Sequence, residues 1–598
     1  MPRWKDKAVE LYINSLLSGP QTHAVNILSN TLTSLAQVPE HAAAAAVGAA
    51  RRAGERVASR VTGREVGNAD RVLFSETGSR AAGMIAGARE GIRAAARSFL
   101  TGDTSDAVSK VEQQQMNAIG GKLGSVIRTP TRLLSAEDEL FKGIARRMEL
   151  NGLALRRAHS EGLRGQAARD RASELVENPD DAMLRGSFEY ARYLTFQTPL
   201  DHDSLAAGIS RGTQRRPEWK LLLPFVRTPV NLLKFAAERS PAAVMMKSWR
   251  KEMAAGGARR DMAVARALLG TGMGAAMYEM AVAGHITGGG PADRDARALL
   301  QADGWQPYSL KVGDRYYSYA RLDPFSTTIG TVADMVDLQS HMTEKQQERS
   351  MTLVAAAIAN NLSSKTWLSG ISSALEAVND PDRYLDNLVS RTAGAIAVPS
   401  IVAQVARTND PIMREARGPM DRLRSRIPGL SDDLKPRRDV FGRPMQQQEA
   451  IGPDLASPLF AGTARRDPTV AALLDAGAHV TKPQRKIGDR ELTDVEYDRY
   501  QEFTGKKAKP RLDELVQTGD WRGMSDEDKQ DAVSALMKAA RKEAKVELFG
   551  APPAKPKRGR RSLPALPEGF KVDELPPLPP GFKVDSAPPL PEGFTLDR

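Results

Sequence analysis

A nearly uncharged Gly/Ala-rich run, followed by an aromatic stretch, sets the narrowest limits on the fold. Residues 267–292 read ALLGTGMGAAMYEMAVAGHITGGGPA, and Glu279 is the only formal charge between Arg266 and Asp293. The next stretch, GWQPYSLKVGDRYYSYARLDPF at residues 304–325, holds six aromatic residues in a chain that is only 5% aromatic. A helix with so little charge beside an aromatic hairpin is more typical of a protein that assembles or inserts than of a catalyst.

The Gly/Ala-rich run is long enough to span a bilayer, since ~20 residues suffice, but its Gly, Ala and Thr content makes it weakly hydrophobic. Gly270 and Gly274 are four residues apart, as are Gly284 and Gly288. This small-xxx-small spacing lets helices approach closely. These four glycines and Glu279 are our candidates for membrane contact or helix packing. Three interpretations stay open: a stable transmembrane helix, conditional insertion or oligomeric packing, and an ordinary buried helix.

The aromatic stretch contains the clearest β signal. Tyr308–Val312 and Arg315–Tyr319 flank Gly313-Asp314, a two-residue loop with Gly first, as a type II′ turn requires. The pattern predicts a β-hairpin over about 308–319.

The remaining sequence favours helices. Abundant Ala and Gly with few aromatics indicate thin, closely packed helices instead of one thick core. We therefore predict a mainly α, elongated multi-helix assembly with one small β-hairpin and a disordered Pro-rich tail. The expected parts are a helical region at 1–300 that includes the 267–292 segment, a hairpin plus helical region at 301–425, an extended Pro/Gly-rich linker at 426–486, a small helical module at 487–550, and a disordered basic and Pro-rich repeat tail at 551–598.

Residues 11–39 contain no Asp, Glu, Lys or Arg. After a break at 18–20, four apolar residues lie at helical spacing on one face, with neutral polar residues around them. The apolar residues are Val25, Leu28, Leu32 and Leu35. Such a helix can lie against lipid or partner helices, although burial inside its own domain is the more common outcome.

The module at 487–550 has clear helix signals. Thr493 and Ser525 each begin a sequence of capping-box form. One apolar stripe then follows, formed by Val533, Met537, Ala540 and Ala544.

The tail differs in kind from the rest of the chain. Its basic residues Lys555, Lys557, Arg558, Arg560 and Arg561 are candidates for non-specific contact with DNA or another polyanion. Three twelve-residue units follow, LPALPEGFKVDE, LPPLPPGFKVDS and APPLPEGFTLDR, which place Phe570, Phe582 and Phe594 one period apart. Their Pro density favours extended polyproline II. They are either a disordered linker or three docking peptides whose Phe side chains anchor in a partner and gain avidity by repetition.

Enzymatic motifs are missing from the sequence. The chain has no cysteine, which excludes disulfides, thiolate metal sites and a Cys nucleophile. It also lacks HExxH and a Walker-type loop. Gly288–Gly290 is interpreted as a helix terminator, and Asp201–Asp203 as a loop. We expect no catalytic site, cofactor or metal.

The net charge of +12 indicates affinity for nucleic acid or anionic lipid. The N-terminus lacks a secretory signal.

Several stretches together resemble internal virion proteins of tailed bacteriophages, the group that includes DNA-ejection proteins and the large polyvalent phage proteins. The carriers are LLSGPQTHAVNILSN at 16–30, RTPTRLLSAEDELFKGIARRMEL at 128–150, ARYLTFQTPL at 191–200, LPFVRTPVNLLKFAAERSP at 223–241, GHITGGGP at 284–291 and the aromatic stretch at 304–325. The module at 490–548 and the PPLPPGF repeats are also similar to parts of such proteins. The resemblance implies a protein packaged in the virion, ejected with DNA, and assembling with other virion proteins and its own copies into a conduit across the host envelope.

Larger members of this group carry lytic or polymerase domains before this region. Because Met1 stands almost directly before the 16–30 motif, we expect such domains to be absent and a separately encoded partner to act beside this chain. Two alternatives are a virion scaffold that docks cargo through the Pro-rich repeats and a peptidoglycan-degrading virion enzyme.

Overall fold

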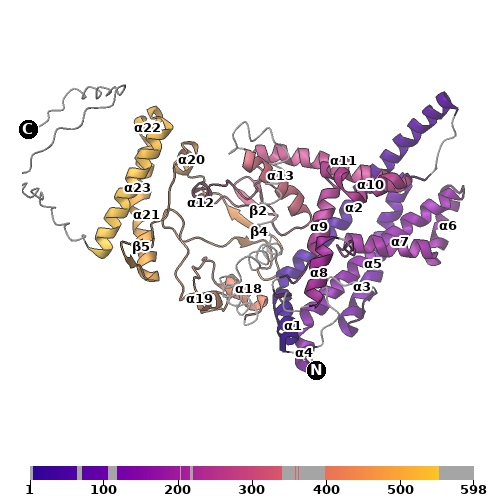
Figure 1. Ribbon diagram of the computed structural model, residues 1–598, viewed down its shortest axis with the longest axis horizontal. Coiled ribbons are helices and arrows are strands. Elements are labelled where there is room, and N and C mark those ends of the chain that lie inside the picture. The colour runs from indigo at the N-terminus through magenta and orange to yellow at the C-terminus, as the bar shows by residue number, and fades with distance from the viewer. Residues whose placement is uncertain are drawn as a thin grey trace, which may run out of the picture. The chain divides into compact units, whose positions relative to one another are not determined.

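The computed structural model describes residues 4–63, 70–105, 118–202, 204–215, 220–221, 223–339, 357, 361 and 398–550 (Figure 1). Within these residues the chain is mainly α-helical and contains small antiparallel sheets, which confirms the predicted fold class. The tail at 551–598, with its predicted disorder and docking repeats, lies outside the described residues.

The described part of residues 4–282 forms a series of packed helices, which we call the N-terminal bundle. The helices are α1 (Trp4–Leu17), α2 (Pro20–Thr62), α3 (Phe74–Thr101), α4 (Gly121–Ile127), α5 (Thr129–Ser160), α6 (Gly165–Glu177), α7 (Asp181–Leu194), α8 (Leu205–Arg215), α9 (Arg227–Glu238), the 3-10 helix η2 (Pro241–Met245), α10 (Lys247–Ala255) and α11 (Gly257–Val282). The break expected at residues 18–20 separates α1 from α2. Pro20 starts α2, where its missing N–H leaves no helical hydrogen bond unmade.

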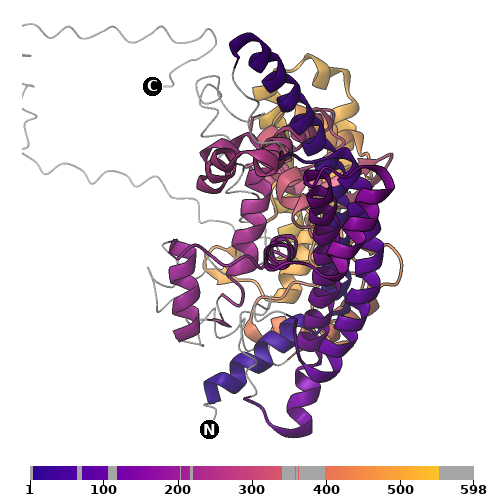
Figure 2. The ribbon, with the colours of Figure 1, turned by 90° about the vertical axis from the view of Figure 1, so that its right-hand side faces the viewer.

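Helices α3 and α5 lie side by side along their lengths (Figures 1 and 2). Gly83, Gly87 and Gly91 recur every four residues on the face of α3 that meets α5. A Cβ atom at Gly87 would lie 2.8 Å from the carbonyl oxygen of Gly143, and one at Gly91 would lie 2.4 Å from that of Leu140. Because these three glycines have no side chains, the backbones of α3 and α5 can approach closely at these positions.

The Gly/Ala-rich run occupies the second half of α11 and the loop after it. The helix ends at Val282, and Gly284 follows with a φ of +74°. Our expectation that Gly288–Gly290 ends the helix was wrong, because the left-handed turn comes earlier. Instead, the backbone N–H groups of Gly289 and Gly290 donate to carboxylates of α13 (Phe325–Gln339), at 2.7 Å to Asp334 and 2.8 Å to Asp337.

The predicted hairpin is confirmed. Strands β1 (Ser309–Val312) and β2 (Arg315–Ser318) pair in antiparallel fashion, and Gly313 has the positive φ, +61°, that its turn position requires. The sheet continues through β4 (Phe460–Thr463) to β3 (Glu449–Ala450). Part of the segment expected as a linker therefore supplies strands to this sheet. Two further helices are α18 (Ser400–Asn409) and α19 (Pro419–Arg424).

One apolar core is shared by three segments: α12 (Arg294–Ala302), residues 437–445 and residues 467–549. We call these three segments together the C-terminal module. Its other elements are α20 (Pro468–Asp475), β5 (Lys486–Ile487), β6 (Arg490–Glu491), α21 (Asp494–Gln517), α22 (Gly519–Gly523) and α23 (Asp526–Phe549). The predicted stripe on α23 is buried, and the capping box at Thr493 is formed. The core residues are Leu299, Ala302, Val440, Phe441, Val470, Leu473, Ala476, Ala478, Val480, Ala508, Leu512, Trp521, Val533, Met537 and Ala540.

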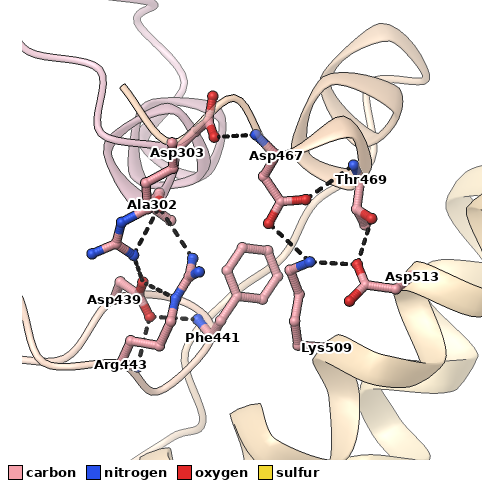
Figure 3. Close-up of polar contacts among 10 residues, drawn as sticks. Ala302, Asp303, Asp439, Phe441, Arg443, Asp467, Thr469, Lys509 and Asp513 are labelled. Carbon is pink, nitrogen blue, oxygen red and sulfur yellow. Dashed lines mark hydrogen bonds and ion pairs between the residues drawn. The ribbon is translucent and has the colours of Figure 1, made fainter. Parts of the chain in front are cut away.

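Polar contacts fix the elements of this module around its core (Figure 3). Asp467 caps α20 by accepting from the backbone N–H of Thr469 at 3.1 Å, and its carboxylate lies 2.8 Å from Nζ of Lys509 on α21. The backbone N–H of Asp467 donates to the carboxylate of Asp303, just after α12, at 2.6 Å. Segments that are distant in the sequence are thereby held together.

Candidate assembly surface

The N-terminal bundle buries polar side chains where α2 meets its neighbours. The buried residues of α2 before its glycine at 48 are mostly polar, and they are Gln21, His23, Ser29, Asn30, Thr33, Ser34, Gln37, Glu40, His41, Ala44 and Ala45. Oε1 of Glu137 on α5 lies 2.7 Å from Nδ1 of His23, and its Oε2 accepts from Asn26 at 2.6 Å. The polar side of α2 therefore faces inward.

The most heavily paired point of this interior is Glu40. Arg239 donates from Nε to Oε1 of Glu40 at 2.6 Å and from Nη2 to Oε2 at 2.7 Å, a bidentate geometry that fixes both side chains. Nε of Arg266 on α11 lies 3.8 Å from the same carboxylate. The two guanidinium groups lie over aromatic rings, Arg239 at 3.2 Å from the centroid of Phe235 and Arg266 at 4.8 Å from that of Tyr193. These rings partly replace the water that the cations have lost.

A second set of ion pairs crosses the glycine contact of α3 and α5. Arg156 donates to both oxygens of Glu76, at 3.0 Å and 2.6 Å, and Glu76 is fully buried. One helical turn further, Arg80 donates to Glu149 at 2.6 Å. Since an unpaired buried charge is strongly destabilising, these pairs specify one way of docking the two helices.

The surroundings also shift the pKa of neutral groups in this interior. Burial lowers the pKa of His41 well below its ordinary value, and the nearby positive charge of Arg80 lowers it further. Nδ1 of His41 lies 2.8 Å from the carbonyl oxygen of Gln37, so this nitrogen carries the proton of the neutral ring. Burial raises the pKa of Tyr190 and of Tyr193, although neighbouring arginines oppose that shift. All three side chains are therefore uncharged at neutral pH.

The outer face of α3 is apolar and basic. Ile85, Ile92 and Phe99 recur every seven residues, which is about two helical turns, and their exposed fractions are 68%, 61% and 38%. The solvent-exposed arginines between them are Arg89, Arg93 and Arg97, which make no ion pair within the described residues. This face, which we call the α3 outer face, combines unburied aliphatic and aromatic surface with uncompensated positive charge.

Other outer faces of the bundle are apolar as well. On α2, Leu35 is 50% exposed and Ile27 is also exposed, while the predicted partners Val25, Leu28 and Leu32 are half-buried. The expected apolar face of this helix is therefore not its buried face. On α11 the exposed apolar residues are Leu268, Met273, Met280 and Val282. None of the helices in the described residues is long and apolar enough to cross a membrane.

The structure separates the five packing candidates of the Gly/Ala-rich run. A Cβ atom at Gly270 would lie 1.9 Å from the carbonyl oxygen of Arg239, and one at Gly288 would lie 2.7 Å from the carboxylate of Asp334. Gly274 makes only an ordinary contact with Val332, at 3.9 Å, and nothing lies near Gly284. Glu279 is exposed on α11. The five residues do not form one surface.

The other predicted site residues lie in the tail, outside the described residues. They are Phe570, Phe582, Phe594, Lys555, Lys557, Arg558, Arg560 and Arg561.

Only one group in the described residues has the spacing of metal ligands, namely Asp293, Asp295 and His479, whose ligand atoms lie within 4.8 Å of one another. Asp293 and His479 are exposed, and Asp293 already caps α12 by accepting from the backbone N–H of Asp295 at 2.8 Å. We assign no ion to this group.

Sequence reasoning missed the α3 outer face, although two signals were present. Gly83, Gly87 and Gly91 at four-residue spacing mark the side of α3 that packs, so the opposite side must be the outer one. The seven-residue period of Ile85 and Ile92 then places aliphatic side chains on that outer side. Comparison of the chain with protein-family models, with curated proteins and with solved structures finds no match.

Proposed function

We propose that this chain is a non-enzymatic structural protein of a tailed bacteriophage, carried inside the virion and ejected with DNA, which assembles into a conduit across the host envelope. Two independent observations support the proposal. One is the resemblance of stretches spread over most of the chain to internal virion proteins. The other is the N-terminal bundle, whose buried contacts are rich in charge and whose outer faces are rich in apolar side chains.

The α3 outer face is the observation that carries the proposal. Burying apolar surface contributes about 25 cal/mol per Å², so Ile85, Ile92 and Phe99 favour a state in which another surface covers them. The bundle cannot cover them by turning α3 around, because Glu76, Arg80 and the glycines are fixed against α5. Because nothing in the described residues covers these three side chains, we infer that the contact comes from another surface.

Charge favours an anionic lipid surface as that contact. A helix with apolar side chains and arginines on one exposed side lies in the headgroup region, where the apolar groups meet acyl chains and the cations meet phosphates. A second copy of the same face would instead bring Arg89, Arg93 and Arg97 against like charges. In the proposed conduit, α3 therefore faces lipid and other faces of the bundle meet neighbouring subunits.

Vesicle flotation of the full chain tests this proposal. Wild-type protein is expected to float with vesicles that contain anionic phospholipid and to sediment as an assembly larger than a monomer. Replacing Ile85, Ile92 and Phe99 together with Ser should abolish flotation while leaving the helical circular dichroism unchanged. A matched variant, Val495→Ser with Val546→Ser, removes exposed apolar side chains from the C-terminal module and should float like the wild type.

Two outcomes would contradict the proposal. A wild-type chain that stays monomeric and does not float at low or neutral pH would exclude the conduit. A triple variant that floats as well as the wild type would show that α3 does not meet lipid. Mass spectrometry of purified virions then tests the packaging claim separately, since the chain must be present in a defined copy number.

The three repeats in the tail support a second role as a docking segment inside the virion. Deleting residues 551–598 should then abolish incorporation into particles or partner binding and leave flotation intact. If the deletion leaves incorporation unchanged, the repeats act only as a spacer.

A further inference from the structure

The C-terminal module contains a cavity of about 230 Å³ that is unrelated to the α3 outer face. Its walls come from α12, from the loop at 437–445 and from the chain near Lys482. The lining residues are Arg294, Arg297, Ala298, Gln301, Arg437, Asp439, Val440, Met445 and Lys482. Four of these side chains are cations and one is an anion.

The spacing of residues on α12 explains one wall. Residues three and four apart lie on the same side of a helix, so Arg294, Arg297 and Gln301 face the cavity together. Arg297 is held in place by donating from Nε and Nη2 to the carbonyl oxygen of Pro291, at 3.1 Å and 2.7 Å. Its Nη1 makes no hydrogen bond within the described residues.

The loop at 437–445 forms another part of the lining. Arg437 and Met445 lie across from each other, because the backbone N–H of Met445 donates to the carbonyl oxygen of Arg437 at 2.8 Å. Lys482 reaches this loop and donates from Nζ to the carbonyl oxygen of Arg438. Burial lowers the pKa of Lys482 and the positive charge of Arg437 lowers it further, while the carboxylates of Glu415 and Asp439 oppose this shift. Arg437 and Lys482 both line the cavity.

Neighbouring charges in the same loop are neutralised within the fold. Arg438 donates to Asp498 at 2.6 Å and to Glu502 at 2.9 Å. Asp439, the single acid of the lining, accepts from the backbone N–H of Phe441 and from Nε of Arg443, both at 2.9 Å (Figure 3). Its charge is thus already matched by an arginine outside the lining.

The cations of the cavity lining differ from Arg438, and two of them, Arg294 and Arg437, are exposed to solvent. Within the described residues, Arg294 and Arg437 form no ion pair, and Arg297 and Lys482 donate only to backbone carbonyls. A lining with this excess of positive charge favours a multivalent anion. Guanidinium groups offer paired N–H donors that match the oxygens of a phosphate, and an ammonium adds a point charge.

We propose that this cavity binds a phosphate group, carried either by a nucleotide or by the backbone of DNA. The apolar residues of the lining, Ala298, Val440 and Met445, suit the organic part of such a ligand better than a bare, fully hydrated ion. The proposal does not depend on the conduit function, since it concerns the C-terminal module alone.

Titration calorimetry of the full chain tests the site with three probes: inorganic phosphate, dATP and a short DNA duplex. Wild-type protein is expected to bind at least one of them, and the variant Arg437→Ala with Lys482→Met should bind about tenfold more weakly or worse, because charge-assisted hydrogen bonds are lost. Binding of dATP identifies a nucleotide site, whereas binding of the duplex without dATP identifies a backbone site. The control Arg499→Ala removes an exposed cation from α21 outside the cavity and should bind within about twofold of the wild type.

The basic tail requires its own control, because residues 555–561 attract DNA by charge alone. Replacing its five cations with Ala should weaken duplex binding in a salt-dependent way and leave dATP binding unchanged. The proposal is wrong if wild-type protein binds none of the probes, if Arg499→Ala weakens binding as much as the cavity variant, or if a polyglutamate peptide displaces the phosphate ligand equally well.

Discussion

The N-terminal bundle and the C-terminal module bury opposite kinds of surface. The module gathers Leu299, Leu473, Leu512 and further apolar side chains into one continuous core, and its exposed large apolar residues are Val495 and Val546. The bundle instead divides its apolar contacts into several small clusters separated by ion pairs. Its exposed apolar residues include Ile27, Leu35, Val57, Val61, Phe74, Ile85, Ile92, Phe99, Leu100, Leu268, Met273, Met280 and Val282.

This difference indicates whether each region buries its apolar surface within its own fold. A domain with a continuous apolar core and a polar exterior needs no other surface to cover its apolar side chains. A helical region with paired charges inside and extended apolar faces outside leaves part of its surface unsatisfied in water. The module therefore buries its own apolar surface, whereas the bundle leaves apolar surface exposed that the proposed assembly would cover. Four substitutions and one labelling experiment test this contrast.

The largest effect is expected from Glu40→Ala in the bundle. The substitution leaves Arg239 and Arg266 buried with less compensation, and breaking a buried pair in this way costs about 3–5 kcal/mol. Chemical denaturation followed by circular dichroism should show that the helices of the bundle unfold at a lower denaturant concentration than in the wild type. The control Glu543→Gln breaks the exposed pair with Arg511 on the module, and it should cost less than about 1 kcal/mol. Equal costs for the two would remove the distinction between the regions.

A somewhat smaller effect is expected from Leu512→Ala in the module. Leu512 is fully buried in the continuous core, so the cavity left behind should lower the free energy of unfolding by about 2–5 kcal/mol. The comparable truncation Ile92→Ala on the α3 outer face should change it by no more than about 0.5 kcal/mol. A large loss from Ile92→Ala in dilute protein would mean that this residue packs within its own fold.

The helix contact in the bundle is tested by Gly87→Ala. The new Cβ atom would meet the carbonyl oxygen of Gly143 at 2.8 Å, so α3 and α5 must separate, at a cost of about 1–3 kcal/mol. Gly78→Ala on the same helix is the matched control, since nothing lies within 4 Å of its Cβ position. That variant should gain about 0.5–1 kcal/mol because alanine favours the helix. Thermal melts that rank the two variants in the reverse order would contradict the close contact.

The smallest effect on stability is a dependence on pH that comes from His41. Its pKa is lowered in the folded chain by burial and by Arg80, so the unfolded chain binds the proton more tightly. The stability that neutral His41 contributes is complete above its unfolded pKa of about 6.5 and is lost as the pH falls below that value, by at most about 1.4 kcal/mol per pH unit. Unfolding free energies at pH 7.5 and 5.5 should therefore differ less for His41→Gln than for the wild type. Identical differences would show that His41 does not carry this dependence.

The sequence allowed the helical class, the hairpin and the α23 stripe to be predicted, because each depends on local spacing or turn chemistry. It did not reveal which side of α2 is buried. The rule that apolar faces point inward failed there, since Glu40 pairs with Arg239 and His41 packs against Tyr190, both more than a hundred residues later in the chain. The role of α12 in the module core was also hidden, because its partners Phe441 and Leu512 are separated from it by the hairpin and the segment after it. Long-range charge pairing and long-range packing leave no local pattern.

The most direct test of the central claim is a fluorescent label at position 92. The chain has no cysteine, so Ile92→Cys and, on the module, Val495→Cys each provide a single attachment point for an environment-sensitive dye. On titration with anionic vesicles, the dye at position 92 should shift its emission to the blue and become shielded from an aqueous quencher, while the dye at position 495 should stay unchanged. A dye at position 92 that remains fully accessible to the quencher at saturating vesicle concentration would contradict the claim that the outer face of α3 meets lipid.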